Sequence, residues 1–214
     1  MRTLALMSQK GGTGKTTLAV HLAVAAAESG QRVAIADTDP QRSATTWGRR
    51  RHGLPPIVAT VTAGELHRAV AAARQDGIGL LIVDSPPHAT PDAPQIALTA
   101  DAVLIPCQPS MFDVAAVGSA VEIVRAAGVP AAVVLNRCPA RAPEIALTRE
   151  ALADCGLPVA ASEIADRRAF ARAVATGRAV TEFETHGKAA EETRALWNWI
   201  EAELFNQPRA RARA

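Results

Sequence analysis

The chain has 214 residues, of which 49% are hydrophobic and 21% are charged, which is enough to bury the core of a single α/β domain. Its net charge of +2 is too small to indicate nucleic-acid binding on its own, and its three cysteines form no C-x-x-C pair, which argues against a disulfide framework or a zinc site. No signal-peptide pattern and no apolar run long enough to span a bilayer are present, so we expect a soluble, cytoplasmic protein.

Short apolar runs alternate with longer amphipathic or alanine-rich patterns along the chain. The short runs predict strands at Thr3–Met7, Val33–Ala36, Leu80–Val83, Ala102–Ile105 and Ala131–Leu135, with a weaker candidate at Leu157–Ala160. The longer patterns predict helices at Lys15–Ser29, Ala63–Gln75, Asp113–Ala127, Ala142–Asp154, Arg167–Thr176 and Lys188–Phe205. Most of these helices are followed by a glycine suited to a left-handed C-terminal cap, namely Gly30, Gly77, Gly128, Gly156 and Gly177.

Continuous apolar strands that alternate with helices are typical of a parallel sheet buried on both faces. We therefore predict one α/β domain over residues 1–207, built as a mostly parallel, twisted sheet with helices on both faces. Residues 208–214 alternate arginine and alanine after a proline, and we expect them to form a disordered basic tail.

The loop after the first predicted strand carries two of the chain's three lysines, Lys10 and Lys15, although the chain otherwise uses arginine for positive charge. Glycines at 11, 12 and 14 allow backbone N–H groups to turn inward around a phosphate, and the following helix adds its positive end. In such a loop Lys15 neutralises the β- and γ-phosphates, and the Thr16 hydroxyl ligates Mg²⁺. A strict P-loop has glycine where this chain has Gln9, so the sequence predicts a deviant P-loop and a P-loop fold.

Three further polar motifs follow predicted strands, at the edge where open α/β sheets bind their ligands. Asp37 and Asp39 follow the second strand, Asp84 follows the third, and Asn136 and Arg137 follow the fifth. An acid after four apolar residues fits a Walker B carboxylate beside Mg²⁺. Each motif alone has a simpler interpretation as a turn or a helix cap, but their order after a P-loop supports a nucleotide and magnesium site.

Together these motifs resemble the ParA/MinD family of deviant Walker A ATPases over most of the chain. The resemblance matches Lys10 to the family's signature lysine, which reaches the phosphates held by the other subunit of an ATP-sandwich dimer. It matches Lys15 to the P-loop lysine and Asp39 to the switch I aspartate that positions the attacking water. Lys10, Lys15 and Asp39 are therefore the expected catalytic residues.

The resemblance also implies the remaining site residues. The expected metal ligands are Thr16, Asp39 and Asp84, the last of which begins switch II. The expected nucleotide contacts are Lys10, Gly11, Gly12, Thr13, Gly14, Lys15, Thr16, Thr17, Pro106, Gln108, Asn136 and Arg137. The stretch from Ile164 to Phe170 is similar to the ParA branch, in its short form without an N-terminal helix-turn-helix.

Such a protein is expected to be a weak Mg²⁺-dependent ATPase that binds ATP and ADP and acts as a switch. The resemblance implies a homodimer on ATP binding, non-specific DNA binding and hydrolysis stimulated by a centromere-binding or adaptor protein. Repetition of this cycle would segregate or position a cargo, which is a plasmid, a chromosome region or a protein assembly. The implied localisation is cytoplasmic and nucleoid-associated.

Family resemblance places the DNA-binding surface on the later helices, which favours Arg167, Arg168 and Arg178. Charges on solvated helix faces usually bind nothing, so the alternative of a solvated face remains open for each of them. The denser run of Arg49, Arg50 and Arg51 could instead serve the nucleotide or a partner. Other basic candidates are Arg172, Lys188, Arg209, Arg211 and Arg213.

Three alternative functions remain. A MinD-like membrane ATPase needs a basic, amphipathic C-terminal helix, but Glu201 and Glu203 favour a helix that docks Trp197, Ile200 and Leu204 on the core, so no membrane partner is expected. An electron-transfer protein would need paired cluster ligands, which Cys107 and Cys138 do not supply. A scaffold that binds nucleotide without hydrolysing it is disfavoured by Asp39.

Overall fold

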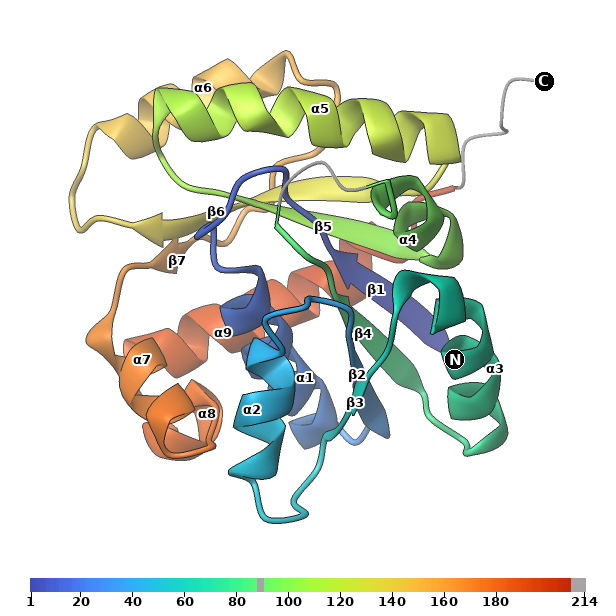
Figure 1. The fold of residues 1–214 in the computed structure, drawn as a ribbon. Coiled ribbons are helices and arrows are strands. Elements are labelled where there is room, and N and C mark those ends of the chain that lie inside the picture. Colours follow the sequence, from blue (N-terminus) through green and yellow to red (C-terminus); the bar gives the residue numbers. More distant parts are fainter. Residues whose placement is uncertain (88–90, 209–214) are drawn as a thin grey trace.

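The computed structural model describes residues 1–87 and 91–208, and it places a parallel sheet between two layers of helices (Figure 1). The strands lie in the order β3-β2-β4-β1-β5-β6-β7, and every neighbouring pair is parallel. Their bounds are β1 Arg2–Leu6, β2 Val33–Asp37, β3 Ile57–Thr60, β4 Leu80–Asp84, β5 Ala102–Cys107, β6 Ala131–Cys138 and β7 Ile164–Ala165. The predicted parallel α/β sheet is confirmed.

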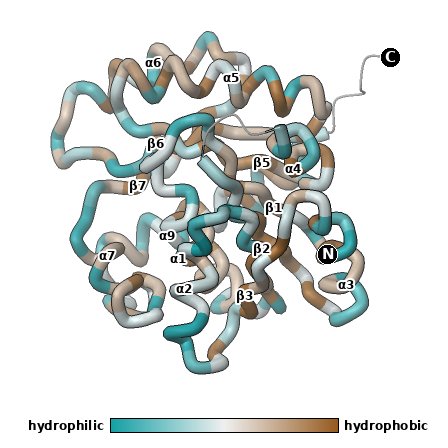
Figure 2. The backbone as a smooth tube through the Cα atoms, viewed as in Figure 1, coloured by the Kyte–Doolittle hydropathy of each residue, from teal (hydrophilic) through white to brown (hydrophobic). Residues whose placement is uncertain are grey.

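Alternation of side chains along the strands separates two hydrophobic clusters, one on each face of the sheet. Leu4 and Leu6 of β1 belong to one cluster, while Ala5 and Met7 belong to the other. The first cluster is covered by α1 (Lys15–Glu28), α2 (Ser43–Arg49), α7 (Arg168–Ala175), α8 (Val180–Phe183) and α9 (Lys188–Trp199). The second is covered by α3 (Leu66–Gln75), α4 (Ala93–Thr99), α5 (Met111–Ala127) and α6 (Glu144–Ala153). Apolar strands therefore run through the middle of the molecule (Figure 2).

The predicted helix ends are confirmed by the backbone. Gly30, Gly77, Gly128, Gly156 and Gly177 all have positive φ angles, between 62° and 92°. The motif acids lie where the strands stop, since Asp37 is the last residue of β2 and Asp84 the last of β4. Asn136 and Arg137 lie near the end of β6, just before its last residue, Cys138. All of these residues therefore reach the same edge of the sheet.

The structure also contains elements that the sequence patterns did not predict, among them β3, α2, α4 and α8. They are short, and β3 is an edge strand whose Ile57 is exposed, so their apolar periodicity is weak. The predicted weak strand at Leu157–Ala160 is wrong, because Val159 forms only an isolated bridge to Val133. The strand beside β6 is instead β7, a few residues further along the chain.

At its C-terminal end the described chain packs against the core. Trp197, Ile200 and Leu204 are 1%, 0% and 0% exposed, which confirms the predicted docking of this helix. After α9 the helix continues as a π-helical turn over Ile200–Leu204. Within the described residues, no helix has the length and apolar character needed to cross a membrane. The predicted tail, including Arg209, Arg211 and Arg213, lies outside the described residues apart from Pro208.

Candidate functional site

A cavity of about 610 Å³ lies at the carboxyl edge of the sheet. The loop after β1 supplies one wall, and Asp39, beyond β2, and Asn136, in β6, reach it from neighbouring strands. The lining residues from the glycine-rich loop and the start of α1 are Gly11, Gly12, Gly14, Lys15, Thr16 and Thr17. Ligand-bearing loops converge here because the carboxyl ends of parallel strands share one edge.

The glycine-rich loop has the geometry of an anion nest. Among the described residues, the backbone N–H groups of Gly11, Gly12, Thr13 and Gly14 donate to no protein acceptor. Gly14 has a φ of 93°, and a Cβ at this position would lie 2.3 Å from Asn136 Nδ2. That amide donates a hydrogen bond of 2.6 Å to the Thr13 carbonyl. Glycine is thus required at 14 both by the backbone angle and by the close approach of β6.

Lys15, at the first position of α1, is the only lysine buried among the described residues, with 6% exposure. Burial lowers the pKa of Lys15, while the nearby carboxylates of Asp84 and Asp39 oppose that shift. An ammonium group that has lost water and faces a nest of free N–H groups is suited to an anionic ligand. A bound phosphate would add to the negative charge of these carboxylates and would accept hydrogen bonds from the buried ammonium group.

Asp37 and Asp39 belong to the same motif but have different roles. Asp37 is fully buried and accepts hydrogen bonds from the Thr45 N–H and Thr45 Oγ1, each at 2.8 Å. It therefore fixes the first turn of α2, and it does not line the cavity. Asp39 lines the cavity, and its Oδ1 accepts a bond of 2.9 Å from the Gln41 N–H. Only Asp39 is placed to act on a bound molecule.

Asp84 is fully buried, and neither of its carboxylate oxygens has a hydrogen-bonding partner among the described residues. Burial raises the pKa of Asp84 to about 7; Asp37 and Asp39 act in the same direction, and the Thr16 side chain and Lys15 act against it. An unpartnered buried carboxylate is costly unless a ligand or cation satisfies it.

These residues fit Mg²⁺. Thr16 and Asp39 line the cavity and carry hard oxygen donors. Asp84 does not line it, but its buried carboxylate ends β4 and interacts with the Thr16 side chain. The described residues contain no cluster of three His, Cys, Asp or Glu side chains that would form an all-protein cage. Mg²⁺ usually takes one or two protein ligands and completes its shell with phosphate and water.

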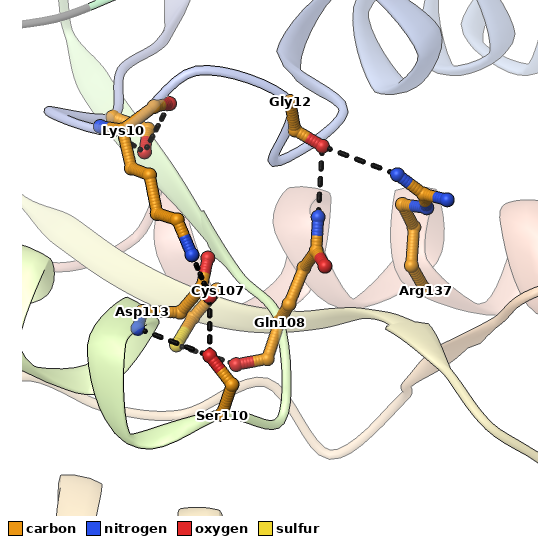
Figure 3. Close-up of polar contacts among 8 residues, drawn as sticks. Lys10, Gly12, Cys107, Gln108, Ser110, Asp113 and Arg137 are labelled. Carbon is orange, nitrogen blue, oxygen red and sulfur yellow. Dashed lines mark hydrogen bonds and ion pairs between the residues drawn. The ribbon is translucent and has the colours of Figure 1, made fainter.

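Two donors from the β5 and β6 ends hold the loop at Gly12 (Figure 3). Gln108 Nε2 donates to the Gly12 carbonyl at 2.8 Å, and Arg137 Nη1 donates to the same oxygen at 3.4 Å. Asn136 and Arg137 line the cavity, whereas Pro106 is buried in β5. The predicted contacts Gln108, Asn136 and Arg137 are thus brought to the loop, while Pro106 is set back from it.

Lys10, by contrast, does not line the cavity. Its ammonium group lies 2.5 Å from the Asp113 carboxylate at the start of α5 (Figure 3). The two lysines of the loop therefore point to different places. The sequence gives no direct signal for this pairing.

The far wall of the cavity comes from β7 and α7, whose residues the sequence motifs did not mark as nucleotide contacts. Its apolar members include Ile164, Phe170 and Val174. Phe170 also packs edge-on against the ring of His21, which is buried in α1 and accepts a hydrogen bond from the Val180 N–H. The signal for this wall was the amphipathic pattern of residues 168–175. Through these contacts of His21, α1 packs against both α7 and α8.

The three arginines predicted to bind DNA have different surroundings. Arg167 lines the cavity and forms a two-pronged ion pair with Glu192, with its closest contact at 2.6 Å. Arg168 and Arg178 are exposed, and no ion pair holds either of them among the described residues. Their role in DNA binding stays a prediction.

The Arg49–Arg51 run is largely structural. Arg51 is 4% exposed, pairs with Glu182 and donates to the Gly177 carbonyl at 2.9 Å. Arg50 donates to the Ala175 carbonyl at 3.1 Å. These contacts fasten α2 to the α7–α8 connection, so Arg51 is not available to a nucleotide or a partner.

Comparison with known proteins places this site in a family context. Residues 4–180 match the CobQ/CobB/MinD/ParA nucleotide binding domain. The chain is 31% identical, over 95% of its own length and 94% of the relative, to the maintenance of carboxysome distribution protein A of Gloeobacter kilaueensis. It is 33% identical to the chromosome-partitioning ATPase Soj of Thermus thermophilus, over 59% of this chain and 64% of Soj.

Solved structures share the fold at lower sequence identity. MinD in the MinC:MinD cell division complex of Aquifex aeolicus superposes with a TM-score of 0.80 at 14% identity, covering 98% of this chain and 99% of that chain. Apo McdA from Cyanothece superposes with a TM-score of 0.77 at 19% identity, covering 92% and 98%. At these identities the likeness is one of fold.

Proposed function

The chain belongs to the CobQ/CobB/MinD/ParA nucleotide-binding family, and from this premise we propose that it is a ParA-type ATPase that positions a cargo. ATP binding closes two subunits into a sandwich dimer, and Mg²⁺-dependent hydrolysis, weak on its own, opens it again. The observation that carries this proposal is the division of the two lysines, with Lys15 in the cavity and Lys10 outside it.

Each residue of the predicted site then has a role. The free N–H groups of the loop and Lys15 bind the phosphates, and Asn136 fixes the loop that holds them. Thr16 and Asp84 would hold Mg²⁺, which would help to neutralise the charge of the phosphates. Asp39 orients the water that attacks the γ-phosphate in line with the leaving oxygen.

Lys10 supplies charge to the partner subunit's ATP. Lys10→Ala is expected to leave ATP affinity within about twofold of wild type, since Lys10 does not line its own cavity, and to abolish the ATP-dependent dimer. Calorimetry measures the affinity, and light scattering measures the mass with and without ATP. A Lys10→Ala protein that doubles its mass with ATP would remove the role in trans.

The dimer is proposed to bind DNA without sequence preference. Arg168 and Arg178 are exposed on α7 and just after it, and dimerisation doubles the phosphate contacts that one subunit can offer. Arg167 is a weaker candidate because Glu192 already neutralises it. Nucleoid association follows from DNA binding of this kind.

The cargo and the partner that stimulates hydrolysis belong to the same proposal. Relatives are named for carboxysome distribution and for chromosome partitioning, so a protein assembly and a DNA region are both supported as cargo. The partner is expected to be a centromere-binding or adaptor protein that recognises the closed dimer.

Co-sedimentation with DNA and with anionic liposomes, under ATP, ADP and no nucleotide, tests the function. We expect the protein to pellet with DNA only in ATP, and the double variant Arg168→Ala, Arg178→Ala to lose about tenfold or more in DNA affinity. Arg74→Ala, an exposed arginine on α3, is the matched control and should bind as wild type. ATP-dependent pelleting with liposomes instead would favour a MinD-like function, and DNA binding in all three states would contradict a nucleotide switch.

A further inference from the structure

The ion pair between Lys10 and Asp113 joins the glycine-rich loop to the start of α5. Lys10 Nζ lies 2.5 Å from Asp113 Oδ2, and the two residues are 103 positions apart in sequence. The Lys10 side chain is 41% exposed, but the Asp113 side chain is only 2% exposed. A buried carboxylate therefore holds a lysine that otherwise extends into solvent (Figure 3).

Asp113 is itself fixed in place. Ser110 Oγ donates to the same Oδ2 at 2.5 Å and caps α5 by accepting from the Asp113 N–H. Asp113 Oδ1 has no hydrogen-bonding partner among the described residues. Apart from one hydroxyl and the positive end of α5, the charge of this buried carboxylate is balanced by Lys10.

The same β5–α5 connection also grips the loop at a second point, because Gln108 Nε2 donates to the Gly12 carbonyl at 2.8 Å. Gln108 and Asp113 thus hold the loop on both sides of Gly11. An ordinary surface ion pair joins two exposed side chains and contributes little. Here Asp113 is buried and Lys10 belongs to the glycine-rich loop, so the ion pair limits the positions that the Lys10 ammonium group can take.

We propose that Asp113 is a positioning residue that keeps Lys10 docked on its own subunit until ATP and a second copy of the chain draw it across, an inference that rests on the proposed sandwich dimer. On closure Lys10 exchanges the Asp113 carboxylate for the phosphates bound by the other subunit. The exchange leaves a buried carboxylate without its cation, which opposes closure. Asp113 thereby sets how much ATP-bound protein is needed before dimers form.

Amine labelling tests the docked state without ATP. The chain has only three lysines: Lys10, the buried Lys15 and the exposed Lys188 on α9, which serves as an internal reference. In the wild type, Lys10 should react about fivefold more slowly than Lys188, as measured by mass spectrometry, because the carboxylate holds its ammonium group. Asp113→Asn should bring Lys10 close to the rate of Lys188, and Asp113→Glu should retain part of the protection.

Dimerisation tests the consequence. Asp113→Asn should form the ATP-dependent dimer at about tenfold lower protein concentration than wild type. Glu122→Gln removes an exposed carboxylate from the same helix and should leave both labelling and dimerisation unchanged. Equal Lys10 labelling in wild type and Asp113→Asn, or an unchanged midpoint of dimerisation, would overturn the proposal.

Two further readouts keep the outcomes separate. If the wild type forms no dimer with ATP, the proposed function fails, whereas the labelling result still decides whether Lys10 is docked. If circular dichroism shows that Asp113→Asn does not fold, labelling of the wild type at rising salt takes its place. Salt should then speed the reaction of Lys10 relative to Lys188, and a constant ratio would count against the ion pair.

Discussion

Replacing Lys15 with alanine is expected to abolish MgATP binding, with a loss of affinity of at least about 100-fold, or roughly 3 kcal/mol. Lys15 is buried at the start of α1, between the free N–H groups of the loop and the carboxylates of Asp39 and Asp84. Without its charge, those carboxylates would face the phosphates with less to offset their repulsion. Isothermal titration calorimetry with ATP and Mg²⁺ gives the affinity directly.

Lys188→Ala is the matched control, since this lysine is exposed at the first position of α9 and makes no ion pair within the described residues. It should bind MgATP as the wild type does. Wild-type affinity in Lys15→Ala would remove the assignment of the cavity as a phosphate site.

Substitution of Asp39 by alanine should cause turnover to fall by about 100-fold or more while ATP binding and the dimer persist. Asp39 lines the cavity, and within the described residues its carboxylate accepts one hydrogen bond, from the Gln41 N–H, so loss of the side chain costs the fold little. It is also a negative charge near the phosphates, and its loss should not weaken ATP binding. Phosphate release measures turnover, and light scattering measures the dimer.

The neighbouring acid distinguishes a chemical role from a structural one. Asp37→Ala should lower the thermal midpoint of unfolding, because Asp37 is fully buried and accepts two hydrogen bonds from Thr45. Asp76→Ala, on the exposed end of α3, should change neither stability nor turnover. Rapid hydrolysis by Asp39→Ala would require another residue to position the water.

The local patterns that predicted the site are those in which a few adjacent residues suffice. The glycines of the loop and the apolar runs that end in Asp37 and Asp84 each lie within one short segment. Parallel strands then bring such segments to one edge without further information. The edge elements β3 and β7 were missed because they are short and carry weak apolar patterns, and α2 because its residues lack a clear helical period.

Sequence by itself determined the parallel α/β fold, the glycine-rich loop and the acids at the ends of the strands, since each depends on neighbouring residues and on strand periodicity. Only the tertiary structure decided which charges are paired. Asp113 binds Lys10, Glu182 binds Arg51 and Glu192 binds Arg167, each across a long stretch of chain. Such pairs leave no local pattern, because their geometry exists only once distant elements pack together. These pairs show which arginines stabilise the fold, namely Arg51 and Arg167. The pair with Asp113 also places Lys10 outside the cavity.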